Sequence, residues 1–76
     1  MNTKTPAEYL VEAGLTGADL EFALARIEDF DVGLVAAQIA DYDDPATAAR
    51  RAKRSGPGVE RAAKIIAAKR AWLAAQ

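Results

Sequence analysis

The sequence contains no cysteine and no histidine, and Ser55 is the only serine among its 76 residues. The missing cysteine excludes disulfide bonds and thiolate metal sites. Ser55 lies in a Gly/Pro-rich segment with no candidate base near it in the sequence, so the usual nucleophile–base pairs cannot be assembled. Glycine-rich phosphate-binding motifs are missing as well. We therefore expect no enzymatic activity and no metal or other cofactor.

Long apolar runs are also missing, because none approaches the roughly 18 residues that a membrane-spanning helix needs. The first ten residues lack the apolar region of a signal peptide. We therefore expect a cytoplasmic protein without a membrane partner. Aromatic residues are few, and we expect most of them in the core: Tyr9, Phe22, Phe30, Tyr42 and Trp72. Phe22 and Trp72 lie at the edges of their apolar faces, where they are also candidate partner anchors.

The most informative feature that is present is the distribution of charge. Residues 1–44 carry ten acidic and two basic side chains, a net charge of −8. Residues 45–76 carry eight basic and one acidic side chain, a net charge of +7. The overall net charge of −1 therefore hides a strong division, which is typical of chains that use charge for interaction.

Capping residues, prolines and glycines divide the chain into helical segments. Thr5, Thr16, Asp31 and Asp44 are expected N-caps, and Gly14 is expected to end the first helix. The expected helices cover about residues 6–13, 16–28, 31–40, 45–54 and 57–76. Apolar residues at helical spacing predict their inner faces: Leu10, Val11, Leu20, Ala23, Leu24, Ile27, Val32, Val35, Ala36, Ile39, Val59, Ala62, Ile66 and Leu73.

These segments predict an all-α protein, a compact bundle of four to five short helices with the C-terminal helix the longest. No sustained two-residue alternation indicates a strand. The length permits one domain over residues 1–76, composed of an acidic three-helix part (6–41) and a basic helical part (45–76). A domain this small has little apolar surface to bury, so we also expect that a partner or a second copy adds stability.

Residues 7–40 resemble the ubiquitin-associated (UBA) three-helix module. The resemblance depends on Ala13-Gly14-Leu15 in the first loop, on Ala23-Leu24, and on Asp31-Val32 followed by Val35-Ala36 and Ile39. It implies a three-helix fold for the acidic part. In that family the first loop and the end of the third helix bind ubiquitin, but the usual methionine or aromatic residue of the loop is missing here. The resemblance therefore implies a fold rather than a ligand.

Asp41, Asp43 and Asp44 form an acidic segment that we expect to be a loop before Pro45. The segment resembles a fragment of a calcium-binding loop, but the central glycine, terminal glutamate and other oxygen ligands of an EF-hand do not follow. We interpret it as a solvated loop in which Asp44 caps the next helix. It is also a second candidate surface for a partner.

The basic segment that follows is the strongest functional signal. Arg50, Arg51, Lys53 and Arg54 spread over one side of a helix, opposite Ala48, Ala49 and Ala52, and Arg61 and Lys64 extend the positive charge onto the last helix. Three interpretations remain open. The cations pair with the acidic half inside the fold, bind nucleic-acid phosphates, or contact an acidic protein surface.

We expect a small non-enzymatic protein-interaction module, an adaptor or inhibitor that occupies a partner's surface. Its contact residues are predicted to be Arg50, Arg51, Lys53, Arg54, Arg61 and Lys64. The first alternative is a nucleic-acid-binding protein that uses the basic helices at 45–55 and 58–76. The second is a structural subunit of a larger, phage-type assembly, and a homodimer is a further expected state.

Overall fold

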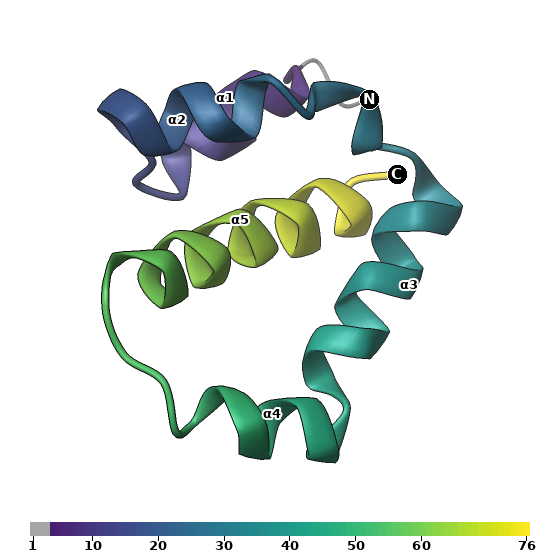
Figure 1. Ribbon diagram of the computed structural model, residues 1–76. Coiled ribbons are helices and arrows are strands. Elements are labelled where there is room, and N and C mark those ends of the chain that lie inside the picture. The colour runs from purple at the N-terminus through teal and green to yellow at the C-terminus, as the bar shows by residue number, and fades with distance from the viewer. Residues whose placement is uncertain (1–3) are drawn as a thin grey trace.

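The computed structural model describes residues 4–76, so the first three residues of the expected domain lie outside the described part. Within it the chain forms five α-helices and no strand, which confirms the all-α prediction (Figure 1). The longest helix is the C-terminal one, as predicted. The elements are α1 (Pro6–Glu12), α2 (Gly17–Leu24), the short 3₁₀ turn η1 (Ile27–Asp29), α3 (Val32–Asp43), α4 (Pro45–Arg51) and α5 (Pro57–Ala74).

Helix α1 shows how closely the sequence determines the helix ends. The Thr5 hydroxyl accepts a hydrogen bond from the Glu8 amide, and the Glu8 carboxylate accepts one from the Thr5 amide, which is a complete capping box. Pro6 occupies the first turn, where no amide hydrogen is needed. At the other end Gly14 adopts a φ of 98°, a left-handed conformation that glycine tolerates best.

Helix α5 is the central element, because both α1 and α3 pack against it. The core between them contains Leu10 and Val35, both fully buried, and Trp72, which is 8% exposed. Trp72 meets Phe30 edge-to-face, with ring centroids 5.3 Å apart. Such a pair adds about 0.5–1.5 kcal/mol to the apolar burial, so the two rings help to fix the η1 turn onto α5.

Four apolar residues that the sequence predicts to face the core are instead exposed, and the smallest of them is Ala36. The other three, Val11, Leu24 and Val32, are 55%, 38% and 52% exposed, so the assignment of all four to the core is wrong. Helix α2 ends at Leu24 rather than continuing to residue 28, and η1 then redirects the chain. Short helices bury only a narrow face, because a residue one position from the centre of the contact already points toward solvent.

One lysine of α5 lies inside the fold. Lys69 is only 8% exposed, and its ammonium group donates a hydrogen bond to Oε1 of Gln38 on α3. It also lies 5.7 Å from the centre of the Phe30 ring. Burial lowers the pKa of Lys69, and the nearby Asp29 carboxylate opposes that shift. A buried cation without an ion pair to a carboxylate costs stability.

The acidic segment at residues 41–44 is not a loop. Helix α3 continues to Asp43, and Asp44 alone separates it from α4. Acidic residues in a last helical turn are unfavourable, but here Arg70 binds both carboxylate oxygens of Asp43. The Arg51 guanidinium donates to the Tyr42 carbonyl oxygen at 3.0 Å. Two cations distant in the sequence therefore permit α3 to extend.

Asp44→Ala is expected to lower the free energy of unfolding by about 0.5–2 kcal/mol, because its carboxylate accepts hydrogen bonds from the amides of Ala46 and Thr47 at the start of α4. Urea unfolding measures the loss, and hydrogen exchange should show faster exchange at those two amides. Asp41→Ala is the matched control and is expected to stay within about 0.5 kcal/mol of the wild type. An equal loss in both variants would contradict the capping role.

Helix α4 packs on α3 rather than on α5, and the segment at residues 52–56 carries the chain back to α5 (Figure 1). The Cα radius of gyration is 12.4 Å, slightly above the roughly 11 Å expected for a chain of this length. This modest expansion fits a helix that stands apart from the core. Among the described residues, no helix has the length and apolar character needed to cross a membrane.

Candidate functional site

Of the two predicted contact residues on α5, Arg61 is engaged within the fold and Lys64 is exposed. The Arg61 guanidinium lies 3.8 Å from an oxygen of Asp19 on α2 and 3.8 Å from the centre of the Phe22 ring. Arg26 covers the same ring at 3.9 Å. Phe22 therefore serves as a stacking partner for two arginines. The aliphatic part of Lys64 lies close to Gly14, at the end of α1.

Arg51 is also engaged within the fold. Its guanidinium stacks over the Tyr42 ring at 3.6 Å from the centroid, in addition to the hydrogen bond to the Tyr42 carbonyl oxygen. Arginine is well suited to this double role, because its planar guanidinium stacks and donates at the same time. Arg51 therefore holds α4 against the end of α3 and keeps a fixed orientation.

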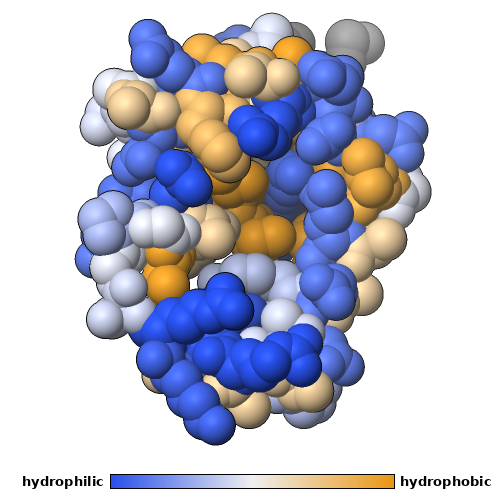
Figure 2. Space-filling model, viewed as in Figure 1, coloured by the Kyte–Doolittle hydropathy of each residue, from blue (hydrophilic) through white to orange (hydrophobic). Residues whose placement is uncertain are grey.

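The remaining three cations of the basic segment are exposed. Within residues 4–76, no carboxylate lies within ion-pair distance of Arg50, Lys53 or Arg54. The Arg50 guanidinium donates a hydrogen bond to the hydroxyl of Thr47, one turn earlier in the same helix, at 3.3 Å. Figure 2 shows that the largest group of strongly hydrophilic atoms on this face lies at the end of the molecule formed by α4. We name Arg50, Lys53 and Arg54 the cationic edge.

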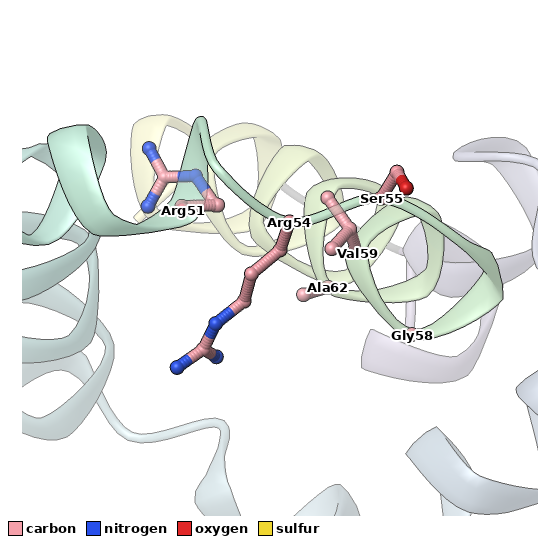
Figure 3. Close-up of a pocket in the computed structure, with 6 residues that line it drawn as sticks. All are labelled: Arg51, Arg54, Ser55, Gly58, Val59 and Ala62. Carbon is pink, nitrogen blue, oxygen red and sulfur yellow. The ribbon is translucent and has the colours of Figure 1, made fainter.

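A hollow of about 550 Å³ lies between the end of α4 and the first turns of α5 (Figure 3). This volume is within the range of typical ligand pockets, although the hollow is open on one side. Its lining consists of Arg51, Arg54, Ser55, Gly58, Val59 and Ala62. In Figure 3 the Arg54 side chain extends beyond Val59 and Ala62, whereas the Arg51 guanidinium turns to a different side.

A second hollow of about 320 Å³ adjoins the first. The two share Arg51, Arg54 and Ala62, and the second also reaches Tyr42 and Thr47. We describe them together as the α4–α5 groove. Its α4 side carries the guanidinium groups, and its α5 side carries small and apolar side chains.

The second predicted surface consists of Asp41, Asp43 and Asp44. The structure uses two of these carboxylates within the fold and leaves the third exposed. The Arg70 guanidinium is hydrogen-bonded to Asp43 and lowers the pKa of that carboxyl group. The Asp44 carboxylate is used as the cap of α4. Asp41 is exposed and lies in the last turn of α3, before α4 begins. The acidic residues therefore mark the N-terminal limit of the cationic edge rather than a separate site.

The α5 side of the groove was not identified from the sequence. Val59 and Ala62 fall on the apolar stripe of α5 and were assigned to the core, but the structure leaves them half-buried at the groove. The only sequence signal for an opening here was Ser55-Gly56-Pro57-Gly58, which separates α4 from α5 and lets them diverge. The length of that segment does not determine whether the two helices meet.

Comparison with protein-family models, with curated proteins and with solved structures finds no match to this chain. The resemblance of residues 7–40 to the UBA module therefore stays a prediction. Those residues do form three helices, α1, α2 and most of α3.

Proposed function

We propose that this protein is a small non-enzymatic binding module, of the adaptor or inhibitor type, that docks on an acidic surface of a partner protein. The observation that carries the proposal is the cationic edge. Arg61, Arg70 and Arg51 are used within the fold, whereas Arg50, Lys53 and Arg54 are exposed and unpaired with any described carboxylate. Exposed charges of one sign steer and select an oppositely charged partner.

The dimensions of the cationic edge favour a protein partner over a nucleic acid. The cationic edge is short, because it runs only from Arg50 at the end of α4 to Arg54 just after it, and Asp41 and Asp44 lie at the N-terminal end of α4. A phosphate backbone that continued past this end would meet carboxylates. An acidic patch on a protein can match a surface of limited length, whereas strong nucleic-acid binding depends on many phosphate contacts.

The test is fluorescence anisotropy with a labelled glutamate-rich peptide and a labelled DNA duplex, each titrated with the protein at several salt concentrations. We expect the peptide to bind at low salt and the affinity to fall as salt rises. Reversal of the cationic edge by Arg50→Glu, Lys53→Glu and Arg54→Glu is expected to weaken peptide binding by about tenfold or more, or about 1.4 kcal/mol.

Arg54→Gln and Arg26→Gln form the matched pair of single variants, because each removes one charge from an exposed arginine and only Arg54 belongs to the cationic edge. We expect weaker peptide binding with Arg54→Gln alone. Tighter binding of the duplex than of the peptide would support nucleic-acid recognition instead. Peptide affinity that the triple reversal leaves unchanged would refute the docking role of the cationic edge.

A further inference from the structure

The α4–α5 groove has two chemically different walls. Arg50, Arg51 and Arg54 line it from α4 and the residues just after it. Val59 and Ala62 line it from α5. No acidic residue lines either hollow. A ligand that satisfies both walls carries negative charge on one side and apolar groups on the other.

We propose that the groove holds an amphipathic acidic segment of the partner protein, whose carboxylates face α4 and whose apolar side chains face Val59 and Ala62. This inference rests on the proposed function and specifies which part of the partner is recognised. An amphipathic segment seated in an apolar groove is a common mode of peptide recognition. The apolar side chains of Val59 and Ala62 on the α5 wall have no matching group on a phosphate backbone, and the one aromatic ring at the groove, Tyr42, already stacks with Arg51.

The two arginines shared by the hollows have different roles in this proposal. Arg51 is fixed by Tyr42, so it forms a preorganised wall. Arg54 is exposed and has no partner within the described residues, so its guanidinium is available to a carboxylate. Arginine binds carboxylates through two parallel hydrogen bonds, which gives the contact a defined geometry.

The experiment compares two labelled peptides of about 14 residues, or about 20 Å as helices. Both contain the same numbers of glutamate and leucine residues. In one peptide the leucines form a single helical stripe, and in the other they are distributed around the helix. We expect the striped peptide to bind at least about fivefold more tightly to the full-length protein, because only it places leucines together against the apolar wall.

Ala62→Gln narrows the groove without a change of charge, and Ala63→Gln makes the same substitution at the next, exposed position of α5. We expect Ala62→Gln to remove the preference for the striped peptide and Ala63→Gln to retain it. Circular dichroism and Trp72 fluorescence confirm that both variants are folded. In the wild type, the amide NMR signals of Val59 and Ala62 are expected to shift on binding of the striped peptide.

The outcomes separate the groove from the cationic edge. Equal affinity for the two peptides, or an unchanged preference in Ala62→Gln, would overturn the groove proposal. If the triple reversal of the cationic edge still weakens the binding of both peptides, the proposed function remains supported even though the groove proposal has failed. If neither peptide binds the wild type at low salt, both proposals are wrong. Amide shifts confined to α1 and α2 would also overturn the groove as the site.

Discussion

Leu10→Ala is expected to lower the free energy of unfolding by about 2–5 kcal/mol. Leu10 is fully buried at the contact between α1 and α5, so truncation removes apolar burial and leaves a cavity. At about 0.05–0.15 kcal/mol per residue, a chain of this length has a total stability of about 4–11 kcal/mol. The single substitution is therefore expected to remove a large part of the stability. Urea unfolding followed by fluorescence of Trp72, the only tryptophan, measures the loss.

Leu34→Ala is the matched control, because it makes the same substitution at a leucine that is 42% exposed. Its expected cost is below about 1 kcal/mol, since much of the side chain is already in water and little cavity forms. Similar losses for the two variants would show that the contact between α1 and α5 does not dominate the core as described.

Lys69→Met is expected to raise the free energy of unfolding by about 1–3 kcal/mol at neutral pH. The folded state holds the Lys69 ammonium group among Gln38, Phe30 and Asp29 with very little access to water. Replacement of buried ionic groups by well-packed apolar side chains is frequently stabilising by this amount. Methionine has a similar length and adapts its shape to the space that the lysine leaves.

The effect of Lys69 on the free energy of unfolding depends on pH in a defined direction. Because burial lowers the pKa of Lys69 in the folded state, the unfolded chain binds this proton more tightly. The contribution of Lys69 to stability therefore increases as pH rises from its folded pKa toward its ordinary value of 10.5. The advantage of Lys69→Met should be largest at neutral pH and shrink with rising pH. Lys64→Met, an exposed lysine on the same helix, is expected to show neither effect.

Helix starts could be predicted from the sequence because they depend on local chemistry, whereas the expected ends at residues 28, 40 and 54 are wrong, since the helices end at Leu24, Asp43 and Arg51. The capping box at Thr5, the cap at Asp31 and the glycine turn after α1 each involve residues within four positions of one another. The longest helix was likewise evident from the uninterrupted pattern after Pro57. Local hydrogen bonds of this kind operate whatever the tertiary context.

Side-chain burial was less predictable because it depends on which helices meet. Val11 and Val32 follow the apolar pattern but lie outside the contacts with α5, whereas Lys69 follows the polar pattern and lies inside one. The extension of α3 to Asp43 depends on Arg70, 27 positions later. No window along the sequence contains both partners of such an interaction.

The candidate site was predicted in part. Charge alone identified the basic segment, but it did not separate Arg50, Lys53 and Arg54 from Arg51 and Arg61. The distinction comes from the rings of Tyr42 and Phe22, which are brought to these arginines only by folding. The apolar wall of the groove escaped prediction for the related reason that α4 packs on α3 and leaves part of α5 uncovered.

The attachment of α4 mainly to α3 has an evolutionary consequence. Under the proposed function, substitutions at the outward positions of α4 and just after it would alter partner recognition while the core between α1, α3 and α5 remains intact. Specificity would then diversify in α4 and the residues just after it at little cost in folding. The same independence makes α4 a suitable segment for randomisation in a library of engineered binders, with the remainder of the chain as a constant scaffold.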